Sequence, residues 1–101
     1  WNMIAGLVCP ELGGDMKYLD ILGVNYYVHN QWVYPGGPGT MIAPSHPHYQ
    51  PVRELLARLH GRFGRPILIA ETGIEEAARP AWLRYMATEV RAAIQNGVPV
   101  E

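Results

Sequence analysis

The sequence predicts an α/β protein whose parallel strands are joined by crossover helices. Strand-like and helix-like segments alternate along its 101 residues, in the order strand, helix, strand, helix and the beginning of another strand. Such alternation is typical of parallel sheets with right-handed crossovers. So few elements cannot cover both faces of a parallel sheet or protect its edges. We therefore expect residues 1–101 to be part of one larger domain.

The first strand is expected over residues 18–27, within the segment DMKYLDILGVNYY. Ile21, Leu22 and Val24 make this segment apolar on both faces, as in a buried strand. The following segment, VYPGGPGTMIAPSHPHYQP, is predicted to be a loop because Gly and Pro recur throughout it. Its GGPG turn lacks the Lys-Ser/Thr pair of a phosphate-binding loop.

A helix is predicted over residues 51–63, with Pro51 in its first turn. Its apolar residues share one face at helical spacing: Val52, Leu55, Leu56, Leu59 and Phe63.

The second strand is expected over residues 66–70, and a second helix over residues 79–96. Pro80 suits the first turn of that helix, and Gly97 stands where a C-terminal capping glycine belongs. The apolar residues 98–100 are expected to begin a further strand.

Polar side chains follow the apolar part of both strands. Because side chains alternate along a strand, Asn25 and Tyr27 should share one face, and Ile67, Ile69 and Glu71 should share a face of the second strand. Parallel α/β proteins place their chemistry at the carboxyl ends of the strands. We expect the three polar side chains to meet there, with the amide and the hydroxyl donating hydrogen bonds to the carboxylate. In the alternative interpretation, Glu71 is only the first solvated residue after a buried strand.

Composition argues against several other classes of protein. The formal net charge is −1 and the eight Lys and Arg residues are scattered, which disfavours nucleic acid as a partner. No run approaches the roughly 20 apolar residues of a membrane span. The single cysteine, Cys9, is compatible with a reducing compartment, and we expect a cytoplasmic location. His46 and His48 lack companion ligands, so we expect no metal, and no organic cofactor is implied.

Two motifs resemble those of a known enzyme family. The segment YLDILGVNYY resembles the sixth-strand signature of family 1 glycoside hydrolases, the β-glucosidase type, and RPILIAETG resembles their seventh-strand motif. The resemblance implies the C-terminal portion, about strands 6 to 8, of a (β/α)8 TIM barrel, and a carbohydrate substrate. It further implies that Glu71 is the catalytic nucleophile, that Tyr27 hydrogen-bonds and orients it, and that Asn25 lines the same pocket.

The chain departs from the family at the nucleophile motif. It has AETG where the family usually has TENG, so that Ala70 and Thr72 replace a threonine and an asparagine. Because ETG also fits other families of the same clan, membership of the retaining clan is the firmer expectation.

A retaining glycosidase needs a second carboxylate about 5–5.5 Å from the nucleophile. Asp20 is expected at the opposite end of its strand, and Glu54 and Glu89 on the outer faces of helices. Glu75 and Glu76 follow Glu71 on a loop. The acid/base is therefore expected outside these residues, and the isolated chain is expected to hydrolyse nothing.

Two residues of the loop after the first strand are further candidates for sugar binding. Trp32 offers an aromatic face for a pyranose ring, and His29 offers hydrogen bonds to hydroxyl groups. Both have a structural alternative, in which they only cover the loop. A second hypothesis for the whole chain is a non-catalytic carbohydrate-binding or accessory domain derived from such a barrel. The sequence gives no expectation for the oligomeric state.

Overall fold

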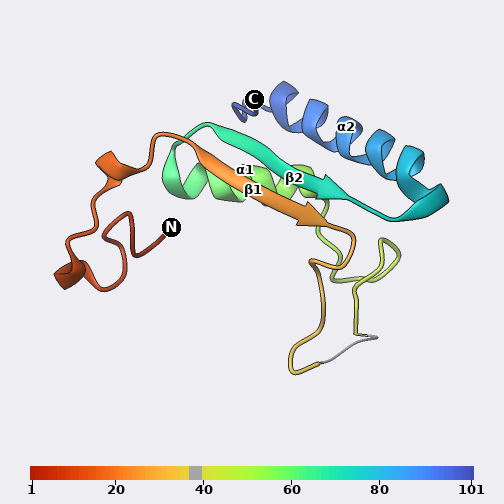
Figure 1. The fold of residues 1–101 in the computed structure, drawn as a ribbon, viewed down its shortest axis with the longest axis horizontal. Helices are drawn as coiled ribbons and strands as arrows, with labels where there is room; N and C mark the ends of the chain where they lie inside the picture. Colours follow the sequence, from red (N-terminus) through yellow and green to blue (C-terminus); the bar gives the residue numbers. More distant parts are fainter. Residues whose placement is uncertain (37–39) are drawn as a thin grey trace.

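The chain forms an α/β unit with a two-stranded parallel sheet and two helices, as seen in a computed structural model that describes residues 1–36 and 40–101. The predicted GGPG turn lies largely outside the described residues. The regular elements, shown in Figure 1, are β1 (Leu22–Tyr27), α1 (Val52–Phe63), β2 (Ile67–Gly73) and α2 (Arg79–Gln95). The predicted α/β class, the parallel pairing and the order of elements are confirmed.

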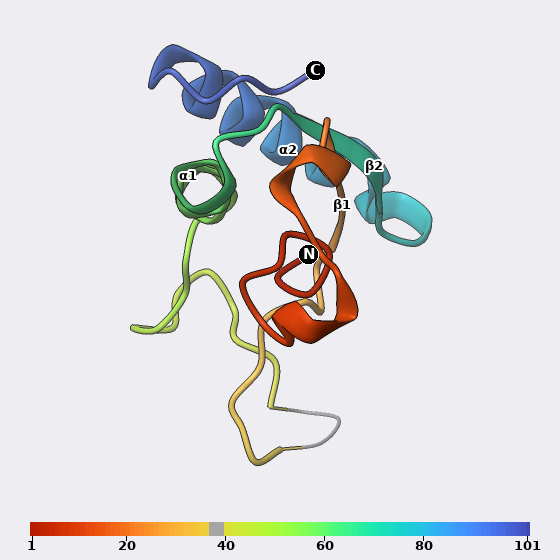
Figure 2. The same cartoon turned by 90° about the vertical axis from the view of Figure 1, so that its left-hand side faces the viewer.

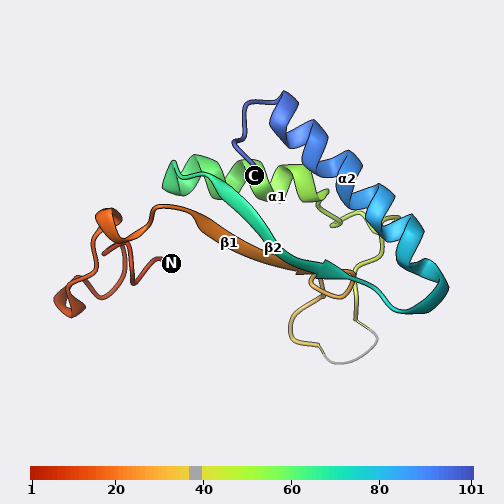
Figure 3. The same cartoon turned by 45° about the horizontal axis from the view of Figure 1, so that its top comes forward.

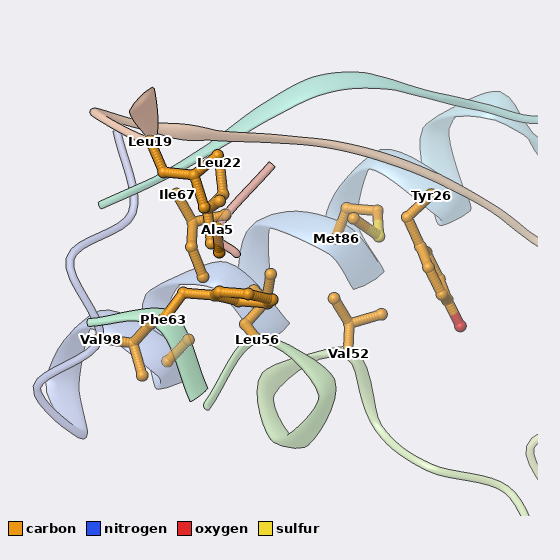
Figure 4. Packing of buried hydrophobic residues seen from close by; sticks show 11 residues of the cluster. Ala5, Leu19, Leu22, Tyr26, Val52, Leu56, Phe63, Ile67, Met86 and Val98 are labelled. Atoms are coloured by element: carbon orange, nitrogen blue, oxygen red, sulfur yellow. The ribbon is translucent and has the colours of Figure 1, made fainter. Parts of the chain in front are cut away.

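Both helices lie on the same side of the sheet (Figures 2 and 3). Leu22 and Ile67 project from the two strands toward α1, where they meet Leu56 and Phe63 (Figure 4). Leu22 and Ile67 are fully buried, and Leu56 is 1% exposed. The amphipathic pattern of α1 thus predicted the face that it turns toward the strands, since Val52, Leu56 and Phe63 are buried there. On α2, Leu83 and Ile94 fall at the same helical spacing as the buried Met86 and Ala93 but are exposed.

The opposite face of the sheet is open. Gly23, Asn25, Leu68 and Ala70, which alternate with the buried strand residues, are accessible on this face. The two faces of a parallel sheet are normally both covered. This open face is therefore the surface on which further structure would have to pack.

β1 begins at Leu22, so the predicted start at residue 18 is wrong. Met16–Tyr18 instead forms a 3₁₀ turn, because the Asp15 carboxylate accepts a hydrogen bond of 2.9 Å from the backbone N–H of Lys17. A short polar side chain can compete with strand formation in this way. Consequently Asp20, which we placed at the beginning of the strand, precedes it.

The beginning of the predicted third strand pairs with β2. Val100 forms an isolated parallel bridge with Ile67. The backbone N–H of Ile67 donates to the Pro99 carbonyl at 2.8 Å, and the N–H of Glu101 donates to the Ile67 carbonyl at 2.9 Å. The sheet therefore continues past β2 in the parallel sense, on the edge away from β1.

Three tyrosines lie together on the helix-covered side of the sheet, where the segment before α1 meets α2. The hydroxyls of Tyr49 and Tyr85 are hydrogen-bonded to each other, and the Tyr26 hydroxyl accepts a bond of 2.8 Å from the Gln31 side chain. Burial is the first cause that raises the pKa of Tyr26, Tyr49 and Tyr85 above the ordinary value of 10.0.

We expect the free energy of unfolding to fall steeply with pH above about 10 because of these three side chains. A tyrosine whose pKa is raised on folding stabilises the protein fully below its unfolded pKa of 10.0, and this contribution is lost as pH rises. Urea denaturation between pH 8 and 11 measures the effect. Tyr49→Phe should make the decline shallower, whereas Tyr34→Phe, at a side chain 87% exposed, should leave it unchanged. Equal slopes in both variants would contradict the assignment.

Candidate functional site

The candidate site lies where β1 and β2 end. The two strands pair in parallel, so that Asn25 lies opposite Glu71 and Tyr27 lies opposite Gly73. The segment of residues 28–36, which follows β1, leaves the sheet at the same end (Figure 1). The three polar residues expected to meet at this end are therefore neighbours in the sheet.

A β-bulge decides which way Glu71 points. The register shifts between Val24 and Asn25, and the extra residue on β2 is Ala70. A bulge of this kind reverses the alternation of side chains beyond it. The prediction that Glu71 shares a face with Ile67 and Ile69 is therefore wrong. Glu71 instead lies on the open face, which it shares with Asn25.

The side chains of Tyr27 and Glu71 are in direct contact. The Tyr27 hydroxyl donates a hydrogen bond of 2.5 Å to Oε2 of Glu71. This bond, followed by desolvation and by the charge of the carboxylate, raises the pKa of Tyr27, so the phenol stays protonated as the donor at neutral pH. The expected hydrogen bond from the tyrosine is confirmed. The expected bond from the Asn25 amide to this carboxylate is not found between these two described residues.

His29 lies beside Tyr27. Its ring stacks on that of Tyr27, with centroids 5.7 Å apart and planes within 3°. Both side chains line a pocket of about 530 Å³, together with Val28, Gly73, Ile74, Glu75 and Ala78. The candidate residue His29 thus contacts Tyr27, and its expected contact with a sugar stays a prediction.

Trp32 has a different position. It lies in the loop after β1, forms an isolated antiparallel bridge with Met41, and is 56% exposed. It is not among the residues that line the pocket. Its accessible ring is compatible with the sugar-stacking prediction, but the structure does not bring it to the Tyr27–Glu71 pair.

The other carboxylates lie on helices and loops. The expectation of an outer-face position is wrong for Glu89, which is 5% exposed and accepts a bond of 2.7 Å from the Arg53 guanidinium on α1. Glu54 is exposed on α1, and Glu75 lines the pocket from the loop after β2. No carboxylate other than Glu71 lies on a strand in the described part of the chain.

Thr72 is the residue whose contribution the sequence did not indicate. Its hydroxyl donates a hydrogen bond of 2.7 Å to the backbone carbonyl of Tyr26 and accepts one of 2.9 Å from the indole N–H of Trp82. From the sequence, Thr72 was only a departure from a family motif. The sequence signal for this role was a threonine directly after the candidate nucleophile. Because side chains alternate along a strand, its hydroxyl points to the face opposite Glu71.

Within residues 1–36 and 40–101, no group of three or more His, Cys, Asp or Glu side chains is arranged to hold a metal ion. In the same ranges, no helix has the length and hydropathy needed to cross a membrane.

The fold and the site together define an α/β unit with a tyrosine–carboxylate pair at the carboxyl ends of two adjacent parallel strands. Comparison with protein-family models gives no match, and comparison with curated proteins gives no significant match.

Proposed function

We propose that this chain is the C-terminal portion, about strands 6 to 8, of a (β/α)8 barrel glycoside hydrolase that works with retention of configuration, and that Glu71 is its nucleophile. One observation carries the proposal: the Tyr27 hydroxyl bonds to Glu71 at 2.5 Å across adjacent parallel strands, at the end where such folds place their chemistry. The two sequence motifs that resemble the glycosidase strands contain these same two residues.

The architecture supports the barrel. Both helices cover one face of the sheet, while the other face carries Leu68 and Ala70 in exposed positions. The sheet also begins to continue in parallel at Val100. Further parallel strands would close the sheet, cover the open face and bring a carboxylate from the fourth strand toward Glu71.

The reaction follows from this arrangement. An ionised Glu71 attacks the anomeric carbon and forms a glycosyl ester, while an acid supplied from outside these residues protonates the departing oxygen. Water, deprotonated by the same group, then cleaves the ester and regenerates the carboxylate. The hydroxyl of Tyr27 holds the carboxylate in one orientation. Correct orientation of a catalytic group contributes a large part of enzymatic rate enhancement.

The test is the stereochemistry of hydrolysis by the intact protein. With a panel of aryl glycosides, ¹H NMR should show that the sugar first released has the anomeric configuration of the substrate. Release of the opposite anomer would contradict Glu71 as the nucleophile. Sugar binding by calorimetry without any hydrolysis would favour the carbohydrate-binding alternative. The isolated 101-residue chain should show no hydrolysis above the buffer background.

A further inference from the structure

One hydroxyl group connects the backbone next to both members of the candidate pair. Thr72 directly follows Glu71 in β2, and Tyr26 directly precedes Tyr27 in β1. The Thr72 hydroxyl donates to the Tyr26 carbonyl at 2.7 Å. The two strands are thus joined by a side chain at the level of the Tyr27–Glu71 contact.

The position of this bond matters because of the bulge. A bulge interrupts the regular hydrogen-bond ladder, and Ala70 is inserted immediately before Glu71. Without the bulge, the alternation along β2 would turn the Glu71 side chain toward the helices and away from Tyr27. The hydroxyl of Thr72 adds a cross-strand bond just after the interruption, where it favours the shifted register.

The indole of Trp82 fixes the direction of this hydroxyl. Its N–H donates to the Thr72 oxygen at 2.9 Å, so the threonine proton is free to point at the Tyr26 carbonyl. The indole is itself held by stacking on the Tyr26 ring, with centroids 6.1 Å apart and planes 7° apart. The two hydrogen bonds of the Thr72 hydroxyl form a relay that connects Trp82 on α2 to the backbone of β1.

We propose that Thr72, oriented by Trp82, is a positioning residue that holds Glu71 and Tyr27 in contact through the shifted register of β1 and β2. Its effect on catalysis rests on the proposed function, whereas its effect on the Tyr27–Glu71 contact does not. Thr72, which replaces the asparagine of the family motif, then has a structural role that depends on its own hydroxyl.

The experiment compares three variants of the intact protein. Thr72→Val keeps the shape of the side chain and removes the hydroxyl, Thr72→Ser keeps the hydroxyl, and Thr88→Val is the matched control. The Thr88 hydroxyl donates to the carbonyl of Arg84 within α2, and the residue is exposed. For Thr72→Val we expect kcat to fall about 10-fold, the upper range for one lost hydrogen bond, with KM changed less than about 2-fold. Thr72→Ser should keep kcat close to that of the wild type, and the control should not change it.

A second readout needs no activity. Tyrosines labelled with ¹³C at the ring carbon that bears the hydroxyl are titrated by NMR, and Tyr27→Phe identifies the signal. Because the bond to Glu71 raises the pKa of Tyr27, Thr72→Val should lower that pKa toward the ordinary value of 10.0. Trp82→Phe keeps an aromatic ring but removes the donor, and should shift the pKa in the same direction by less.

The outcomes separate the two proposals. A wild-type protein that hydrolyses no glycoside, but whose Tyr27 titration responds to Thr72→Val and Trp82→Phe, would overturn the function and retain the positioning role. An unchanged titration in Trp82→Phe and in a folded Thr72→Val would overturn the positioning role. If Thr72→Val does not fold, Trp82→Phe decides alone.

Discussion

Replacing Glu71 by Gln is expected to lower kcat of the intact protein by at least about 10³-fold, since loss of a catalytic nucleophile commonly costs this much or more. The amide matches the carboxylate in shape but cannot attack the anomeric carbon. It can still accept a hydrogen bond from the Tyr27 hydroxyl, which contacts Oε2 in the native protein. The loss should therefore appear in kcat, while sugar binding by calorimetry stays close to that of the wild type.

The matched control is Glu76→Gln, which makes the same change of charge in the short 3₁₀ turn after β2. It should leave kcat within about 2-fold of the wild type, as expected for a side chain outside the reaction. Glu71→Ala adds a sharper comparison. With an activated aryl glycoside, azide should enter the vacated space and yield a glycosyl azide of inverted configuration. Restored hydrolysis with retention, or equal losses in Glu71→Gln and Glu76→Gln, would contradict the assignment.

The largest expected effect on stability is that of Leu56→Ala, which should lower the free energy of unfolding by about 2–5 kcal/mol. Leu56 is 1% exposed on the face of α1 that packs against β1 and β2 (Figure 4). Truncation removes apolar contact area and leaves a cavity between the helix and the sheet. Urea denaturation of the intact protein, followed by circular dichroism, measures the change.

Leu83→Ala is the control for this substitution. It removes the same atoms from α2, at a side chain that is 65% exposed, and should cost less than about 1 kcal/mol. If the two variants were equally stable, α1 would not pack on the sheet through Leu56, and the layered arrangement that positions the site would be wrong.

The helices were predictable from the sequence because their signals are local. α1 and α2 begin and end close to the predicted bounds, where Pro51, Pro80 and Gly97 mark the termini. The start of β1 was missed although its cause is also local. The Asp15 side chain stabilises a turn at residues that otherwise resemble a strand.

The candidate site was predictable only in part. Parallel pairing predicted that Tyr27 and Glu71 lie at the same end of the sheet, and the hydrogen bond expected between them is present. The face of Glu71 depends on the bulge at Ala70, which arises from pairing with β1. Pairing between segments so far apart in the chain leaves no periodic signal in either strand. The same holds for the relay through Thr72 and Trp82, because three separate elements must be in place before their hydrogen bonds exist.

The most direct test of the central claim is to identify the residue that becomes covalently attached to the sugar. The intact protein is incubated with an activated 2-deoxy-2-fluoro glycoside, digested and analysed by tandem mass spectrometry. We expect a single fluoroglycosyl adduct on Glu71, absent from the Glu71→Gln variant and still formed in Glu76→Gln. An adduct on any other carboxylate, with Glu71 unmodified in an inactivated protein, would contradict the claim that Glu71 is the nucleophile.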